Sequence, residues 1–561
     1  MIKHMPSGRY AALAVIVLAL GFTACKKNKV EPTPEKKPQT SDPATGNTQQ
    51  TPTTDRVQLT NDSLFLYAKE VYYWNEALPT YDEYLPRKYT NGAANLDKYK
   101  NNLFNIGKIS ASVDYRQGYS SLKYSFIEDA TAANPQASIP NSLASVDSEG
   151  NGNDVGIRID AYRTDANNPL TYSLIVTAVY PGSPAEAAGV KRGWVIRTVN
   201  GQSFGANINT EYNAAINAFE GASLAITGTV YTGGTKLNDF ALTLTKKSYK
   251  SSPIYKAITL TAGTKKIGYL AFARFSTLDN TTKGDLDAAF ADFSTRGVKD
   301  LVIDLRYNGG GYINTAEYLI NLIAPSGLNG KVMFREYYNN TMRSRKAGIL
   351  INQPVTDVNG KLIYDRTLGR NLTQADDDYS PEAQSTSFSK KGALTGVTNV
   401  VFIVSDRTAS ASELVINSLK PFVNVKLVGE TTYGKPVGFF PIRIENRYDV
   451  FYAMFETKNA NGEGGYFNGI VPDYDAATST EATFFDNPLY EFGDVKEGYL
   501  AKAVAAIPGT AGSSALASAK SARMSVREES NTTTAVPPMI LVSRDRNTEF
   551  IGMIKTPGRR Q

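Results

Sequence analysis

The sequence is 561 residues long, 42% apolar and 20% charged, which is typical of a globular protein with room for about three domains. Its formal net charge of +6 is too weak and too dispersed to indicate nucleic-acid binding. With one cysteine and one histidine, the chain has no intramolecular disulfide and few ways to build a histidine-ligated metal site.

The first residues have the pattern of a secretory signal peptide. Lys3 and Arg9 make a basic segment, and the apolar run that follows is shorter than the roughly 20 residues of a membrane span. The run ends in TAC, which resembles a bacterial lipobox, with Cys25 as the lipidated residue. We expect a signal peptide over 1–24, and the alternative is a plain secretory signal with a chance cysteine.

Lipidation at Cys25 would place the protein in the cell envelope, periplasmic or at the outer membrane, with the membrane as a partner through the lipid. Residues 25–55 are rich in Pro, Thr and Lys, so we expect a flexible tether there. Cleavage before Cys25 would also remove His4, the single histidine. Ser-His-Asp and Cys-His catalysis would then be excluded, and a serine nucleophile would need another base.

Residues 56–150 are expected to form a small N-terminal helical domain. Apolar residues recur at helical spacing from Leu64 to Leu78, which predicts a helix that Asp62 or Ser63 caps and Pro79 ends.

Residues 151–248 alternate in the manner of short strands and contain VYPGSPAEAAGVKRGWVIRTVNGQSF. This run resembles a PDZ module: a strand, a Pro-Gly turn, a short helix, a second strand and a hairpin. The strand that faces a bound peptide would then lie at Asp154–Asp160. PDZ modules add an extended chain end to a sheet edge, so the resemblance implies peptide contacts at Val155, Gly156 and Ile157.

From 249 to 508, buried strands such as KDLVIDL and NVVFIV alternate with helices such as NTAEYLINLIAP. This alternation predicts an α/β domain with a largely parallel sheet. A polar stretch at about 329–395 is expected as an insertion, either a hairpin or a lid. Residues 509–561 are expected to be a low-complexity tail, with a strand-like last part, PPMILVSRDRNTEFIGMIK, that the sequence alone does not place.

Three segments of this domain carry candidate chemistry. In VSDRTASASELVINSLK, Ser410 lies between a strand and a helix, where it can cap the helix with Glu413 or act as a nucleophile beside helix N–H groups. In VIDLRYNGGG, the glycines would let the backbone approach a substrate. In LVGETTYGKPVG, Lys435 is the candidate base, because burial can lower a lysine pKa by about 3 units. The alternative for Lys435 is a surface loop.

Together these segments resemble the C-terminal-processing, or tail-specific, serine peptidases of bacterial lipoprotein type. The DLR.N.GG, SASASE and GxxTxGK motifs of that family occur here, in the same order, as DLRYNGGG, TASASE and GETTYGK. The resemblance spans about 60–508. It implies an α+β multidomain fold: a small helical region, a PDZ-like β-rich module and an α/β serine peptidase core of ClpP/crotonase-like type.

The resemblance also implies roles for individual residues. Ser410 would be the nucleophile and Lys435 the base. The oxyanion donors would be the amide of Ala411 and one from the region of Gly309 and Gly310. The sequence departs from the family at Phe439, where a glutamine usually orients the lysine. The nearby candidates for that third part are Ser412, Glu430 and Thr431.

We therefore expect a secreted, lipid-anchored serine endopeptidase that forms an acyl-enzyme and cleaves protein substrates recognised through their C-terminal tails. No metal, no cofactor and no nucleic-acid partner is expected, and the oligomeric state stays open. The runner-up is a non-catalytic ligand- or peptide-binding lipoprotein on the same fold. A carbohydrate-binding surface lipoprotein is a third reading, based on tyrosine content and tethering.

Overall fold

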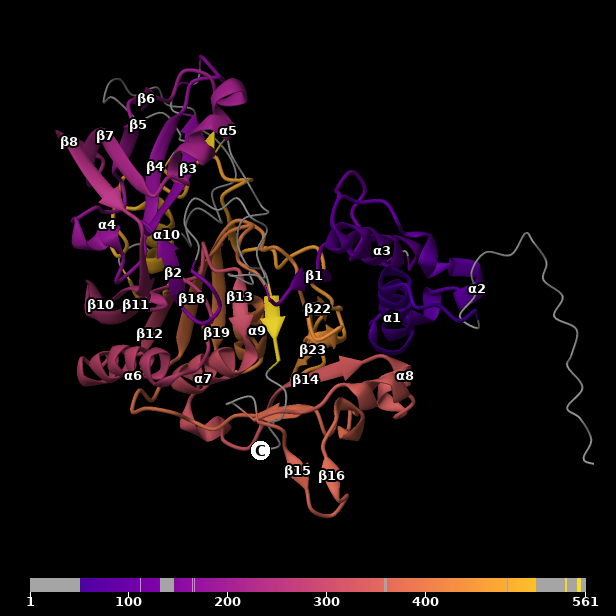
Figure 1. Ribbon diagram of the computed structural model, residues 1–561. Coiled ribbons are helices and arrows are strands. Elements are labelled where there is room, and N and C mark those ends of the chain that lie inside the picture. The colour runs from indigo at the N-terminus through magenta and orange to yellow at the C-terminus, as the bar shows by residue number, and fades with distance from the viewer. Residues whose placement is uncertain are drawn as a thin grey trace, which may run out of the picture. The chain divides into compact units, whose positions relative to one another are not determined.

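The computed structural model describes residues 51–510, except 111, 132–145, 164, 166, 358–360 and 482, together with 540–541 and 552–555 (Figure 1). These residues all belong to one unit of the chain, residues 47–561. The expected signal peptide, Cys25, most of the expected tether and residues 511–539 of the expected tail lie outside the described residues.

The N-terminal region is mainly helical, with α1 (Arg56–Val71), α2 (Tyr81–Tyr84) and α3 (Asn95–Ile109), followed by the strand β1 (Phe126–Asp129). The expected bounds of the first helix are wrong. Asp55 caps α1 by accepting the N–H groups of Val57 and Gln58, and the helix ends at Val71 because Tyr72 is extended. Asp62 lies inside the helix and forms a buried ion pair with Arg87 instead of capping.

A second module follows, built around a sheet with its own hydrophobic core. Its strands are β2 (Asn151–Asp154), β3 (Ile157–Arg163), β4 (Ser173–Val179), β5 (Val195–Val199), β6 (Gln202–Ser203), β7 (Ser223–Thr232), β8 (Thr235–Thr245) and β9 (Lys247–Lys250). Two helices, α4 (Pro184–Ala187) and α5 (Ile208–Phe219), complete it. The sheet order is β25-β3-β4-β5-β7-β8, so a strand from far along the chain, β25 (Ile540–Leu541), lies at its edge.

The central sheet of the third part carries the expected strands in a largely parallel arrangement. Its order is β10 (Ile254–Ala262), β11 (Lys265–Phe272), β12 (Asp300–Asp304), β18 (Asn399–Val404), β19 (Asn424–Gly429) and β24 (Tyr474–Asp475). The pair β10–β11 is antiparallel, and the other pairs are parallel.

Helices cover both faces of this sheet. Successive side chains of a strand point to opposite faces, so Leu301 and Ile303 enter one apolar cluster while Val302 enters another. The first cluster includes residues of α6 (Asn280–Thr295), α7 (Ile313–Ile323) and α9 (Ala411–Leu419), and the second includes α10 (Gly498–Ala505). Burial on both faces explains why these strands read as continuous apolar runs.

Smaller sheets accompany the central sheet. One has the order β17 (Ser385–Ser387), β14 (Val332–Tyr338), β23 (Phe455–Asn459) and β20 (Val437–Gly438). Another joins β1 to β22 (Tyr448–Phe451) and β21 (Ile442–Ile444). The polar stretch 329–395 contributes β14 and β17 to the first of these, and also contains α8 (Asn340–Arg343) and the hairpin β15 (Tyr364–Asp365) and β16 (Arg370–Asn371). Finally, β13 (Gly310–Tyr312) pairs with β26 (Gly552–Ile554).

Candidate active site

Ser410 stands on the tight turn between β18 and α9. Its φ of 61° is in the left-handed region, which costs a non-glycine residue roughly 1–3 kcal/mol and is held only by surrounding structure. The residue is fully buried, and among the described residues its Oγ has no hydrogen-bond partner. The hydroxyl therefore does not cap the helix. Only half of the expected capping box exists, because Glu413 accepts the Ser410 N–H at 2.8 Å.

Glu413 connects the serine turn to the lysine loop. Its Oε2 accepts the backbone N–H of Ser410 and that of Lys435, each at 2.8 Å. Its Oε1 accepts the Gly434 N–H at 2.8 Å and the Thr432 hydroxyl. Burial raises the pKa of Glu413, and the four donors oppose that rise. The sequence indicated Glu413 only as a helix cap, because the loop that it holds lies about twenty residues further along.

Lys435 is buried, with an exposed fraction of 1%, which rules out the surface-loop alternative. Its Nζ donates to the Tyr124 carbonyl at 3.3 Å and lies 4.6 Å from the centre of the Phe439 ring. Burial lowers the pKa of Lys435 to about 7, while the carboxylates of Asp114 and Glu413 partly counteract this effect. About half of the amine is therefore neutral near pH 7, as a general base requires.

Ser410 and Lys435 are brought together through their backbones, since both N–H groups bind the same oxygen of Glu413. Their side chains do not hydrogen-bond to each other, because Ser410 Oγ has no partner among the described residues. Hydrogen bonds between catalytic groups often tighten only when a substrate binds. In this structure the lysine amine is turned toward the Tyr124 carbonyl.

Phe439 occupies the position of the missing glutamine. The residue is fully buried, and its ring packs edge-to-face against Phe126 at 5.6 Å and against Phe451 at 5.2 Å. An apolar ring offers no conventional acceptor, whereas the Tyr124 carbonyl accepts a hydrogen bond from the Lys435 amine. Of the nearby candidates, Ser412 instead donates to the Asn308 carbonyl at 3.1 Å.

The glycine loop after β12 packs directly against Ser410. A Cβ on Gly310 would lie 2.9 Å from Ser410 Cβ, and Gly310 has a φ of 109°, so only glycine fits without strain. The Gly310 N–H donates to Asn308 Oδ1 at 2.9 Å, which turns it toward its own loop. The Ala411 N–H is the first of α9 and has no acceptor within the helix. Of the expected oxyanion donors, Ala411 thus fits better than Gly310.

The strand-loop DLRYN also carries a buried charge network. Arg306, with a side chain only 2% exposed, pairs with Asp304 at 2.8 Å, Asp486 at 2.7 Å and Glu497 at 3.0 Å. The neighbouring Tyr307 hydroxyl donates to Asp486. A buried arginine is stable only with such partners, so this network fixes the loop that precedes the glycines.

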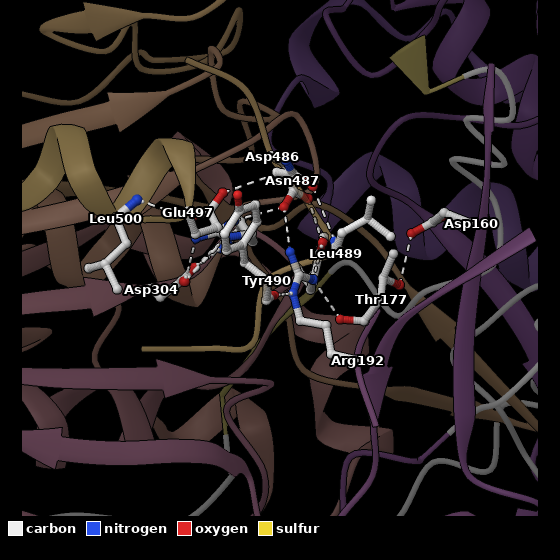
Figure 2. A network of polar contacts seen from close by, with 12 residues as sticks. Asp160, Thr177, Arg192, Asp304, Asp486, Asn487, Leu489, Tyr490, Glu497 and Leu500 are labelled. Carbon is white, nitrogen blue, oxygen red and sulfur yellow. Dashed lines mark hydrogen bonds and ion pairs between the residues drawn. The ribbon is translucent and has the colours of Figure 1, made fainter. Parts of the chain in front are cut away.

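The second module joins the same network (Figure 2). Arg192, just before β5, pairs with Asp486 at 2.7 Å and donates to the carbonyls of Thr177 and Tyr490. A separate pair links Asp160 on β3 to Arg407 at 2.7 Å, three residues before Ser410. One ion pair therefore connects this module to the segment that carries the candidate nucleophile, and the other connects it to the network that holds Arg306 before the glycine loop.

The three residues expected to bind peptide lie where β3 begins. Val155 and Ile157 are buried, and the carbonyls of Val155 and Gly156 accept N–H groups from Ala185 and Tyr180. A Cβ on Gly156 would lie 2.0 Å from Ser183 Cβ, so the segment is packed against the turn before α4. The edge of β3 is paired further along, at Tyr162 and Arg163, with β25.

Within the described ranges, no group of three or more His, Cys, Asp or Glu side chains is arranged to hold a metal ion. The helices of that same part of the chain are all too short or too polar to cross a membrane.

Comparison with known proteins agrees with this geometry. Residues 266–476 match the family model Peptidase family S41, and residues 175–222 match a PDZ domain model. The carboxy-terminal processing protease CtpA of Bacillus subtilis is 26% identical over 308 residues, which are 54% of this chain and 53% of that protein. A chloroplastic C-terminal processing peptidase of Tetradesmus obliquus is 26% identical over 270 residues, 47% of this chain and 48% of that protein.

The match thus spans about half the length of these curated relatives. A Bacteroides fragilis crystal structure assigned to the S41 proteases aligns with a TM-score of 0.53 at 22% identity, covering 79% of this chain and 95% of that one, and so shows a shared fold. Residues 175–222 thus match a PDZ domain and residues 266–476 match the core of peptidase family S41, as the resemblance implied.

Proposed function

We propose that this chain, with its PDZ domain and its S41 peptidase core, is a serine endopeptidase in which Ser410 is the nucleophile and Lys435 the general base. One observation carries the proposal. Two residues are tied through their backbones to the carboxylate of Glu413: a buried serine whose hydroxyl has no hydrogen-bond partner within the described part of the chain, and a buried lysine with a pKa of about 7. A fully solvated lysine would be almost entirely charged at pH 7 and could not serve as a base.

The proposed reaction follows from these positions. The neutral Lys435 amine leaves the Tyr124 carbonyl, accepts the proton of Ser410 Oγ, and the oxygen attacks the scissile carbonyl carbon. The N–H groups of Ala411 and Gly309 hold the oxyanion of the tetrahedral intermediate. The Lys435 ammonium then protonates the leaving amine. Water, deprotonated by the same lysine, hydrolyses the acyl-enzyme and frees Ser410.

Serine variants test this function. Ser410→Ala should abolish both hydrolysis of fluorogenic peptides with apolar C-termini and labelling by a fluorophosphonate probe. Ser418→Ala is a matched control, because Ser418 is a buried serine of α9 whose Oγ, like that of Ser410, has no partner among the described residues. Equal labelling of Ser410→Ala and wild type would rule out the mechanism. A wild-type protein that neither labels nor hydrolyses would instead support the non-catalytic binding protein.

The substrates of this peptidase are proposed to be proteins whose C-terminal tails the PDZ domain recognises. The PDZ match and the ion pairs from Arg192 and Arg407 support this, since they join the module to the candidate active site. The test compares hydrolysis of one reporter protein with its tail free and with its terminal carboxylate amidated. Equal rates for both would contradict recognition of the tail.

We also propose that the protein is lipid-anchored at Cys25 in the cell envelope. The apolar run that ends in TAC supports this, as does the polar, proline-rich segment that follows it. Cells fed an alkyne fatty acid should incorporate it into the wild-type chain and not into Cys25→Ser. Labelling that survives the substitution would exclude this anchor.

A further inference from the structure

A strand from the end of the chain lies in the candidate active site. β26 (Gly552–Ile554) runs parallel to β13, and it pairs Gly552, Met553 and Ile554 with Gly310, Gly311 and Tyr312. The Gly552 N–H also donates to the Gly309 carbonyl at 3.2 Å. Figure 1 shows β26 as the yellow arrow beside β13. The glycine loop that packs against Ser410 therefore has an extended peptide already hydrogen-bonded to it.

This peptide lies close to the candidate nucleophile. A Cβ on Gly310 would be 2.5 Å from the Gly552 carbonyl oxygen and 2.9 Å from Ser410 Cβ. The two atoms are thus no further apart than the sum of these distances. A substrate whose carbonyl carbon is attacked by Ser410 Oγ needs the same space, so β26 and a bound substrate exclude each other.

The opposite side of β26 is bound to the strand of the lysine loop. The Phe439 N–H donates to the Met553 carbonyl at 3.1 Å, and the Lys555 N–H donates to the Phe439 carbonyl at 2.9 Å. Residues 552–555 therefore fill a groove between β13 and the segment Val437–Phe439, with main-chain hydrogen bonds on both sides. This is how an extended peptide adds to exposed sheet edges.

Side chains of the same strand occupy two pockets of different chemistry. Met553 is fully buried and belongs to the main hydrophobic cluster. The Lys555 amine donates to Glu336 Oε2 at 2.6 Å, and also to Tyr338 and to Gln384. The rings of Tyr338 and Phe455 lie 5.4 and 5.8 Å from it.

The second pocket is suited to an ammonium group. Glu336 is only 4% exposed, and a buried carboxylate is costly unless a cation accompanies it. Aromatic rings add a further attraction for positive charge. An arginine or a neutral side chain would not fit as well, because the pocket offers compact acceptors around one nitrogen.

We propose that residues 552–555 are an intramolecular ligand of the substrate groove, and that the Glu336 pocket is a lysine subsite of that groove. The tail must leave before a substrate binds. The preferred occupant is an extended peptide with an apolar side chain followed, two residues later, by lysine. The identification of the groove as a substrate site rests on the proposed function. The binding of the tail peptide to that groove does not.

The main test measures peptide binding on the full-length chain with Ser410→Ala, so that hydrolysis plays no part. The tail is displaced by Met553→Asp with Lys555→Glu, and the matched control is Lys346→Glu at an exposed lysine. The probe is a fluorescein-labelled peptide with the sequence of residues 549–558, EFIGMIKTPG. Fluorescence anisotropy should show at least tenfold tighter binding to the displaced-tail protein than to the control. Equal affinities would overturn the proposal.

The lysine subsite is tested with a second peptide, in which norleucine replaces the lysine and keeps its aliphatic chain. On the displaced-tail protein we expect this peptide to bind at least tenfold more weakly than the lysine peptide. Glu336→Gln should remove most of that difference. Equal binding of the two peptides to the protein with Glu336 would refute the subsite.

Access to the serine gives a third readout, in proteins that keep Ser410. The displaced-tail protein should react with a fluorophosphonate at least fivefold faster than the Lys346→Glu control. An unchanged labelling rate, or loss of the folded core on displacement, would mean that β26 is a permanent structural strand. Peptide binding without any labelling would keep the groove assignment and reject the proposed peptidase function.

Discussion

The Glu413 carboxylate accepts the backbone N–H of Lys435 at 2.8 Å, which ties the lysine loop to the first turn of α9. The same oxygen holds the N–H of Ser410. One buried side chain thereby sets the relative position of two segments that are joined only by α9, β19 and the loops beside them. We regard Glu413 as a positioning residue, because its contacts are with three backbone N–H groups and the Thr432 hydroxyl, and not with the reacting atoms.

Glu413→Gln should lower kcat by roughly 100-fold, since misplacement of catalytic groups by about an ångström has effects of that size. The glutamine amide has one acceptor oxygen where the carboxylate has two. The donors that now bind one of the two Glu413 oxygens must therefore lose their acceptor. The Glu413 carboxylate raises the pKa of Lys435 in the wild type, so removing its charge should move the acidic limb of the pH profile to lower pH. Glu382→Gln, at an exposed site, is the control. A kcat like that of the control would show that Glu413 does not position the lysine.

Turnover should depend on pH through Lys435. The base acts in its neutral form, and burial lowers its pKa to about 7, so kcat/KM should rise with pH and level off above roughly 8. Lys435→Arg should be inactive, because a guanidinium stays protonated. The rate of fluorophosphonate labelling should follow the same curve. A profile that is flat between pH 6 and 9 would exclude a neutral lysine as the base.

The stability of the fold should also depend on pH through Lys435. The unfolded lysine keeps its proton up to about 10.5, whereas the folded one releases it near 7, so the unfolding free energy should rise with pH between these values. Lys435→Met should weaken that rise and stabilise the protein by roughly 2–4 kcal/mol at pH 7. Chemical denaturation at pH 7 and pH 9 measures both effects, and an unchanged slope in the variant would contradict them.

Phe439→Gln should restore a side-chain acceptor near the lysine amine. An amide oxygen favours the ammonium form, so the acidic limb of the pH profile should move to higher pH. Loss of the ring contacts with Phe126 and Phe451 should destabilise the fold by roughly 2–4 kcal/mol. Phe451→Gln should cost similar stability without the shift in pH. Identical pH profiles for the two variants would show that position 439 does not influence Lys435.

Asp486→Asn should weaken the link between the PDZ domain and the core. Burial alone would raise the pKa of Asp486, but the guanidiniums of Arg192 and Arg306 lower it to about 2. Its contribution to stability is therefore present above the unfolded value of 3.8 and is lost as pH falls through 2. The variant leaves two buried cations without this partner, so we expect a loss of roughly 3–5 kcal/mol.

Calorimetry of Asp486→Asn should show the first unfolding transition at a lower temperature than in the wild type. If the domains unfold separately, a second transition should follow. Asp82→Asn, at an exposed position, serves as the control and should melt like the wild type. An Asp486→Asn melt that coincides with the control would mean that the network does not hold the two parts together.

Much of the fold was predictable because its signals are local. The continuous apolar strands, the small residues of the PDZ run and the order of the three motifs all lie within short stretches of chain. The first helix was misplaced for the same reason. Its apolar spacing continues to Leu78, but Tyr72 leaves the helical conformation where the chain turns to pack, and spacing alone does not report that.

The sequence by itself determined which reactive groups are present. It has a serine on a strand-helix turn, a lysine at the family spacing, and no histidine besides His4 that could act as the usual catalytic base. Only the tertiary structure decided how these groups work. The burial of Lys435, the bridge through Glu413, the Tyr124 carbonyl in place of a glutamine and the tail strand beside Ser410 each join residues distant in sequence. Hydrogen bonds and desolvation depend on distance in space, and that distance is set only when the whole chain has packed.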